Sequence, residues 1–326
     1  MQTKTVTIVG LERNGASVAL AIQAAGLDLT IIGHDRNHGL AKQAEKDAIV
    51  HKAQRNLPRA VEKADILVLT VATEELQETL QIVGDLVQEH TLILDLSSWK
   101  QAGAKWAAEY VKQGHYVGAA LVLAAEAMSD GRQGQEAASA GLFKNSVFCI
   151  MPSVDADPKA VETSVNFGRL LGATPYFVDP LEYDVLVQGV ETVPGLLAAA
   201  MFSAVHKATG WRDMLRFAGL PFAQTTQPLI DGANIARLAA GNKIATLRWL
   251  DSLQAELAQV RSWIESGEEE LLEAMLEELR NQREEWLHER TKNDWLEIDA
   301  PDMDAPSIAR QMFGGFARDR DRDQKD

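Results

Sequence analysis

The sequence predicts an α/β protein of the Rossmann type, a doubly wound parallel sheet followed by an all-α domain. Three observations lead to this prediction. Short, β-branched apolar runs alternate with amphipathic stretches up to about residue 178, as is typical of strands covered on both faces. A glycine-bearing turn joins the first run to a helix, and no strand-like run follows residue 179. The 326 residues therefore divide into a dinucleotide-binding sheet domain over 1–178 and a helical domain over 179–296.

The individual elements follow in order along the chain. Strands are predicted at residues 5–9, 29–32, 66–71, 92–96, 116–123, 147–151 and 175–178, with a small-residue helix over 16–25 after the first. Helices are predicted over 186–209 (interrupted by Pro194), 223–266 and 268–291. Their apolar residues, three or four positions apart, indicate core or dimer-interface packing. Residues 297–326 mix Pro, Asp and Arg and are expected to be a disordered tail.

Composition narrows the class of protein. The chain is 46% hydrophobic and 24% charged, which is ordinary for a globular protein. Its net charge of -15, of which residues 251–300 carry two thirds, disfavours nucleic acid and anionic lipid as partners. With one cysteine, no signal peptide and no long apolar run, we expect a cytoplasmic protein that does not enter a membrane. The scattered histidines predict no metal site, and Cys149 lies in an apolar strand as a core residue.

The turn after the first strand is similar in place and length to a dinucleotide fingerprint. Gly10 is suited to the tight turn and Gly15 to close packing of helix on strand, while Arg13 and the helix N-terminus attract phosphate. Asp35, 20 residues after Gly15, stands where an acid binds the ribose of NAD. Arg36 beside it leaves the choice between NAD and NADP open.

Glu12 occupies the place of the middle glycine and opposes this interpretation. A carboxylate about 4 Å from the pyrophosphate, at an effective dielectric near 20, costs roughly 4 kcal/mol unless it points to solvent or pairs with Arg13. Two hypotheses therefore stay open at this point, a working cofactor site and a Rossmann-type fold that has lost its cofactor.

Several further segments, taken in order over about residues 5–265, resemble the prephenate/arogenate dehydrogenase family. They include the small-residue helix from Gly15, the segment DLSSWK at 95–100, the strand at 116–119, LFK at 142–144, VPGLLAAA at 193–200 and GWRDMLR at 210–216. The resemblance implies a Rossmann domain joined to a helical dimerisation domain. It also implies the oxidative decarboxylation of prephenate or arogenate in tyrosine biosynthesis, with NAD or NADP as hydride acceptor.

The resemblance also assigns roles to residues. Ser98 takes the place of the serine that orients the substrate hydroxyl, and Glu126 that of a glutamate near the catalytic histidine. Arg216 takes the place of the clamp on a substrate carboxylate, with Arg212 as a secondary positive charge. A small-molecule acid is the expected substrate, and a homodimer through the helical domain is the expected assembly.

The departures from the family pattern fall where the chemistry is expected. Ala120 stands in place of the catalytic histidine, and Tyr183, Thr192 and Gly195 replace histidines of the helical domain. Loss of a general base costs roughly 10²–10⁴-fold in rate. Two alternatives result: a divergent NAD(P)-dependent dehydrogenase, or a catalytically inactive dimeric relative that serves as a binding or regulatory protein.

Overall fold

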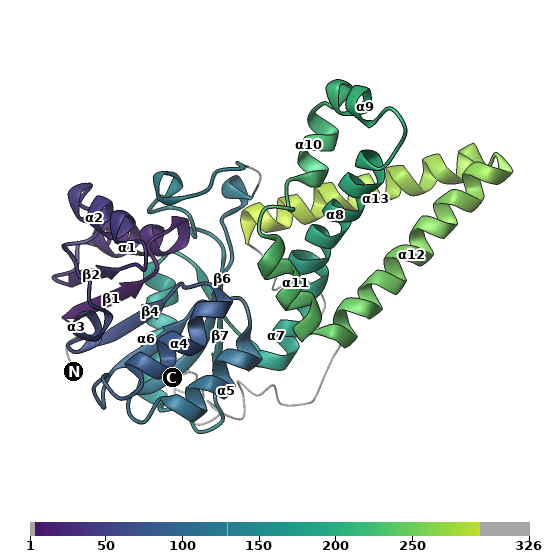
Figure 1. Ribbon diagram of the computed structural model, residues 1–326. Coiled ribbons are helices and arrows are strands. Elements are labelled where there is room, and N and C mark those ends of the chain that lie inside the picture. Colours follow the sequence, from purple (N-terminus) through teal and green to yellow (C-terminus); the bar gives the residue numbers. More distant parts are fainter. Residues whose placement is uncertain (1–3, 129, 294–326) are drawn as a thin grey trace, which may run out of the picture.

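The computed structural model describes residues 4–128 and 130–293, so the predicted tail over 297–326 lies outside the described residues. A sheet domain and a helical domain lie side by side, and α13 runs back from the helical domain toward the sheet (Figure 1). The predicted fold class, a Rossmann-type sheet followed by helices, is confirmed.

One eight-stranded sheet has the order β3-β2-β1-β4-β5-β6-β7-β8. Its strands are β1 Thr5–Val9, β2 Thr30–His34, β3 Lys52–Ala53, β4 Ile66–Leu69, β5 Leu92–Asp95, β6 His115–Leu121, β7 Val147–Pro152 and β8 Thr174–Phe177. All neighbouring strands are parallel except β6 and β7, so the expectation of a wholly parallel sheet is wrong at that pair. β7 reverses because the connection after β6 contains no full crossover helix, only the short helices η1 Ala125–Ala127 and η2 Gln135–Ala137. The edge strand β3, of two residues, was not predicted.

Helices cover both faces of the sheet. One face carries α1 Arg13–Ala24, α2 His38–Lys46 and α6 Pro158–Leu170, whose apolar side chains pack with Ile8 and Leu94. The other carries α3 Leu57–Val61, α4 Thr73–Val83 and α5 Lys100–Tyr110, which pack with Leu67 and Ile93. β1 pairs with both β2 and β4, so the strand order reverses there, which is where open α/β sheets place a ligand crevice.

The helical domain is built from α7 Pro180–Val187, the π-helix η3 Gln188–Thr192, α8 Val193–His206, α9 Trp211–Phe217, α10 Leu220–Thr226, α11 Gly232–Gly241, α12 Lys243–Ser266 and α13 Glu269–Lys292. The prediction of one helix over 223–266 is wrong. The chain breaks at Asp231, whose side chain accepts the Asn234 N–H and starts α11, and again at Asn242, which flanks both α11 and α12.

The helical domain leaves much apolar surface uncovered. Phe217, Leu220 and Ile244 are among its large exposed side chains, and α12 and α13 form a long hairpin that projects from the molecule (Figure 1). Within the described residues, the stretch Pro180–His206 is long and apolar enough to cross a membrane, with a mean hydropathy of 1.6. Length and composition alone are weak evidence for a span, because a core or interface helix has the same properties.

Candidate functional site

The turn between β1 and α1 has a geometry that requires its two glycines. Gly10 adopts a φ of +97°, and a Cβ there would lie 2.6–2.9 Å from atoms of Thr70. A Cβ at Gly15 would lie 2.0 Å from the Gly10 carbonyl oxygen. Any side chain at either position therefore displaces backbone, and the helix can approach the strand only with glycine at both.

The N-terminus of α1 is open at this turn. Glu12 is its N-cap residue, in an extended conformation and with no side-chain capping hydrogen bond. Its side chain is exposed and makes no hydrogen bond or ion pair with any described residue. The first-turn N–H groups stay available to an anion, and Glu12 does not pair with Arg13.

Asp35 follows β2 and lies against the same turn. Its Oδ2 accepts the Leu11 N–H at 2.7 Å, and its Oδ1 accepts the Asn37 N–H at 2.7 Å. The carboxylate is thereby fixed beside the glycine turn, as ribose binding requires. The tight turn, the open helix end and this oriented acid together fit a dinucleotide, with Gly10, Gly15 and Asp35 as the residues that would hold it.

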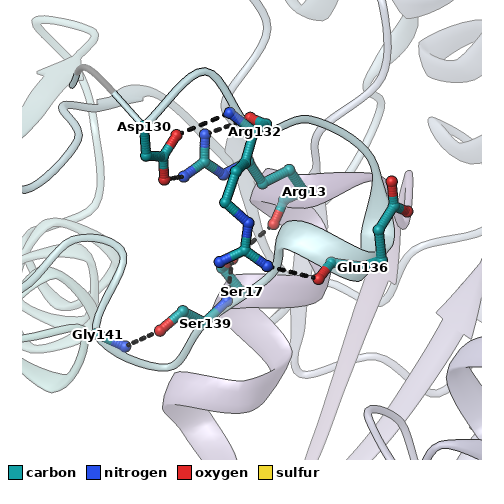
Figure 2. A network of polar contacts seen from close by, with 7 residues as sticks. All are labelled: Arg13, Ser17, Asp130, Arg132, Glu136, Ser139 and Gly141. Carbon is teal, nitrogen blue, oxygen red and sulfur yellow. Dashed lines mark hydrogen bonds and ion pairs between the residues drawn. The ribbon is translucent and has the colours of Figure 1, made fainter. Parts of the chain in front are cut away.

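Arg13 is bound by the segment that returns from β6 over α1 (Figure 2). Its guanidinium forms an ion pair with Asp130 and donates to the Arg132 carbonyl oxygen at 2.6 Å. The backbone N–H of Arg132, and then the hydrogen bond from Arg13, hold the pKa of Asp130 below its usual value. Ser139 N–H donates to Ser17 Oγ nearby. Arg13 thus ties this segment to α1, and its charge is matched by Asp130.

Arg36 leaves the end of β2 and reaches α4. Its guanidinium contacts Glu75 Oε1 at 3.0 Å and Glu78, and its side chain is 62% exposed. Since α4 follows β4, these ion pairs join the two sides of the point where the strand order reverses. Asp35 and Arg36 therefore differ: the acid faces the glycine turn, and the cation is bound by two glutamates.

The segment DLSSWK forms a rigid, buried turn between β5 and α5. Lys100 is 1% exposed and donates from Nζ to the carbonyl oxygens of Asp95, at 2.9 Å, and Ser97. The Asp95 carboxylate accepts the Ser97 N–H and the Tyr116 hydroxyl. Burial lowers the pKa of Lys100 and raises that of Tyr116. Lys100 is buried as a cation because two carbonyl oxygens and the nearby carboxylates of Asp95 and Asp184 compensate the loss of water.

Ser98 stands on this turn and is exposed. Its side chain does not cap α5. Asp184 of α7 does so instead, accepting the N–H groups of Lys100 at 2.9 Å and Gln101 at 2.8 Å. Burial raises the pKa of Asp184, although those N–H groups act in the opposite direction. The helical domain thus holds the turn that presents Ser98.

Two more contacts join α11 of the helical domain to the sheet domain. Arg237 of α11 pairs with Glu74 of α4 at 2.6 Å. A Cβ at Gly241 would lie 2.5 Å from the Trp99 ring, so the end of α11 rests on the β5–α5 turn. Sequence reasoning missed Arg237 and Asp184, because each acts on a residue more than 80 positions away and no local pattern marks such a pair.

Ala120, which the resemblance aligns with the family's catalytic histidine, lies in a small apolar cluster. It is 5% exposed, pairs with Cys149 of β7 and packs near Met151 and Tyr183. Burial raises the pKa of Cys149 to about 11, and burial also raises that of Tyr183. The prediction that Cys149 is a core residue is confirmed. Neither Cys149 nor Tyr183 is therefore an acid or base that titrates near neutral pH.

Apolar packing also surrounds Gly195, which the resemblance aligns with a histidine of the helical domain. A Cβ at Gly195 would lie 2.5 Å from Ile235 Cδ1, so this side chain of α11 fills the space beside α8. Thr192 is buried, and among described residues its Oγ1 has no hydrogen-bond partner. It ends η3, a π-helical turn of the kind often found at functional sites.

The remaining predicted site residues are exposed and dispersed. Glu126 lies in η1. Arg216 pairs with Asp213, and Arg212 lies over the Trp211 ring, 5.4 Å from its centroid. Both arginines belong to α9, at the end of the helical domain away from the sheet (Figure 1). A single chain therefore brings together Gly10, Gly15 and Asp35, and it does not bring α9 to them.

Metal chemistry finds no support in the described part of the chain, where no three His, Cys, Asp or Glu side chains gather in a way that suits an ion.

Comparisons with known proteins agree with this architecture. Residues 18–176 match the family model of the prephenate dehydrogenase nucleotide-binding domain, a range that begins just after the glycine turn. The chain is 24% identical over 296 residues to a prephenate dehydrogenase of Lactococcus lactis subsp. cremoris (strain MG1363), covering 84% of this chain and 75% of the relative.

Solved structures of similar fold include two from this group of enzymes. Prephenate dehydrogenase from Aquifex aeolicus, in complex with hydroxyphenyl propionate and NAD+, superposes with a TM-score of 0.77 at 20% identity, covering 87% of this chain and 99% of that one. Synechocystis arogenate dehydrogenase gives a TM-score of 0.67 at 21% identity, covering 86% and 99%. At these identities the likeness of the structures concerns the fold.

Proposed function

We propose that this chain, whose residues 18–176 match the prephenate dehydrogenase nucleotide-binding domain, is an NAD(P)-dependent oxidoreductase of the prephenate dehydrogenase type. The observation that carries the proposal is the β1–α1 turn, where Gly10, Gly15 and the oriented Asp35 leave a helix N-terminus open for a pyrophosphate. When bound, the nicotinamide accepts a hydride. The substrate is prephenate or arogenate, whose ring carbon gives up the hydride while a carboxylate leaves as carbon dioxide, a step of tyrosine biosynthesis.

Ser98 is the residue to which we assign the orientation of the substrate hydroxyl. The turn that carries Ser98 is fixed by the hydrogen bonds of the buried Lys100 and by Asp184 of the helical domain. The exposed Ser98 hydroxyl is therefore held in a defined position. Since Ala120 supplies no base, the hydroxyl proton passes to water, and turnover is slow by roughly 10²–10⁴-fold. Glu126 is the remaining carboxylate assigned to the site.

Arg212 and Arg216 are assigned to the substrate carboxylates. Their helix α9 lies away from the sheet of its own chain, so this assignment requires α9 of a second copy. Exposed apolar side chains on the helical domain, among them Leu197, Met201 and Phe217, support a homodimer through that domain. We place the protein in the cytoplasm, with no nucleic acid or membrane partner, on its strongly negative charge and its family.

A second candidate function rests on the two repacked histidine positions. Ile235 fills the space beside Gly195, and Ala120 lies among apolar side chains. Both changes remove acid–base groups and leave the fold well packed. They favour a catalytically inactive dimeric relative that binds a cofactor or a small acid without turning it over.

Calorimetric titration with NADH and NADPH tests the proposal. Binding of at least one is expected, and no binding of either at millimolar concentration contradicts it. If a cofactor binds, prephenate and arogenate oxidation are measured for the wild type and for Glu12→Gly/Ala120→His, with Ala108→His on the exposed face of α5 as control. A rate that rises only in the first variant supports the dehydrogenase, and an unchanged zero rate supports the inactive relative.

A further inference from the structure

Arg36, the residue next to Asp35, forms ion pairs with two glutamates and is therefore not free to bind the additional phosphate of NADP. NAD and NADP differ by one phosphate on the adenosine ribose, and a nearby arginine is the usual means of accepting it. We propose that this site selects NAD(H) over NADP(H), and that Glu75 and Glu78 enforce the selection by holding Arg36. The proposal rests on the proposed function, because it concerns the same cofactor site.

The acid at the ribose position is fixed. Asp35 uses one carboxylate oxygen for the Leu11 N–H and the other for the Asn37 N–H, both at 2.7 Å. These two hydrogen bonds keep a negative charge at the end of β2, facing the glycine turn. Ribose hydroxyls can donate to such a carboxylate, whereas a phosphate on the ribose meets a like charge.

The guanidinium of Arg36, next to Asp35, is bound by α4. Arg36 contacts Glu75 Oε1 at 3.0 Å and also Glu78, so its guanidinium has a carboxylate at each amino group. Both glutamates lie on α4, across the crevice from β2. One such surface ion pair is weak, but two on one guanidinium fix its direction and compete with any incoming phosphate.

The local charge balance adds to the selection. Arg13 is matched by Asp130, and Arg36 is shared by two glutamates. Glu12, exposed at the start of α1, has no partner among the described residues. The crevice border therefore carries an excess of carboxylates, which disfavours the cofactor with the additional dianionic group.

The test measures dissociation constants of NADH and NADPH by calorimetry on the full chain. The wild type is expected to bind NADH at least about 30-fold more tightly, and Glu75→Gln/Glu78→Gln to lower this ratio about tenfold, as expected for two unit charges near a solvated dianion. In that background, Arg36→Ala restores the high ratio. Glu89→Gln/Glu162→Gln, which removes two exposed charges elsewhere, leaves it unchanged. Thermal melts of each variant confirm folding.

The outcomes separate the two proposals. If neither cofactor binds, the proposed function fails and the selection fails with it. If NADPH binds the wild type as tightly as NADH, the selection is overturned while the proposed function stands. A preference for NADH that the double glutamine variant does not reduce overturns the role of Glu75 and Glu78.

Discussion

The glycine turn at Gly10 and Gly15 keeps the geometry of a dinucleotide fingerprint, whereas the positions that the resemblance aligns with histidines, Ala120 and Gly195, lie among apolar side chains. Around Gly10 and Gly15 the geometry is set by the backbone, and it is present although Glu12 stands where the fingerprint has its middle glycine. Around Ala120 and Gly195, which the resemblance aligns with histidines, apolar neighbours fill the space. Binding through main-chain groups tolerates a changed side chain, whereas acid–base chemistry is lost with a single residue.

The segment DLSSWK combines a structural part with an exposed candidate catalytic residue. Asp95 and Lys100 are buried in a network of hydrogen bonds, and Ser98 is exposed on the turn that they hold. Stability alone accounts for the persistence of the two buried residues. The presence of the segment is therefore weaker evidence for catalysis than its sequence suggests.

The largest effect is expected for Lys100→Ala. Its removal leaves the carbonyl oxygens of Asp95 and Ser97 without a donor and the buried carboxylates of Asp95 and Asp184 without a cation. We expect the free energy of unfolding to fall by about 3–5 kcal/mol, the usual cost of breaking a buried charge pair. Urea denaturation measures it.

Lys105→Ala, on the exposed face of the same helix, is the matched control and should change stability by less than about 0.5 kcal/mol. Ser98→Ala is expected to behave like the control. If Lys100→Ala also costs less than about 1 kcal/mol, the segment is not a structural element and its persistence points back to function.

The reactivity of Cys149 measures how well water is excluded around Ala120, since the two residues are paired on β6 and β7. Burial raises the pKa of its thiol from 9.0 to about 11, so the thiol stays protonated until the pH approaches that value. At pH 8 the reactive thiolate is about 100-fold scarcer than in the unfolded chain. Alkylation by iodoacetamide should therefore be at least that much slower in the folded protein, and it should accelerate as the pH rises toward 11.

The same chain in urea is the control for this labelling, because it contains no other cysteine. Fast alkylation of the folded protein at pH 8 would mean that the cluster around Ala120 is open to water. The apolar packing at Ala120 would then be incomplete, and the contrast between the two regions would weaken.

Much of the sheet domain follows from its sequence. Buried parallel strands read as continuous apolar runs, and seven of the eight were predicted near their observed places. The direction of β7 was not predictable, because antiparallel pairing depends on how the long segment after β6 returns over α1. The breaks at Asp231 and Asn242 escaped a pattern based on apolar spacing, although both residue types favour helix ends.

The candidate site was less predictable than the fold. Gly10, Gly15 and Asp35 were predicted because they follow a fingerprint of fixed sequence spacing. The partners of Arg13 and Lys100 lie on segments brought together only by the fold, so Asp130 and Asp184 carry no signal in the sequence. Likewise, the resemblance aligns Gly195 with a histidine, but only the structure shows that Ile235 fills the space beside it.

The smallest effect is expected where a histidine is returned to the helical domain. Gly195→His places a Cβ 2.5 Å from Ile235 Cδ1, so the new ring overfills the contact between α8 and α11. Overpacking of this kind costs about 1–3 kcal/mol in the free energy of unfolding. Gly232→His, at the open start of α11, is the control and should cost less than about 1 kcal/mol, since nothing lies within 4 Å of a Cβ there.

Ile235→Ala should relieve this cost. In the Gly195→His/Ile235→Ala variant, the loss of stability is expected to be smaller than the sum of the two single losses by about 1 kcal/mol, because the substitutions share one contact. Additive losses would show that Ile235 does not occupy the histidine's space. If the effects couple and the rate of prephenate oxidation also increases, the result supports the dehydrogenase. If they couple without any increase in rate, the result supports the catalytically inactive relative.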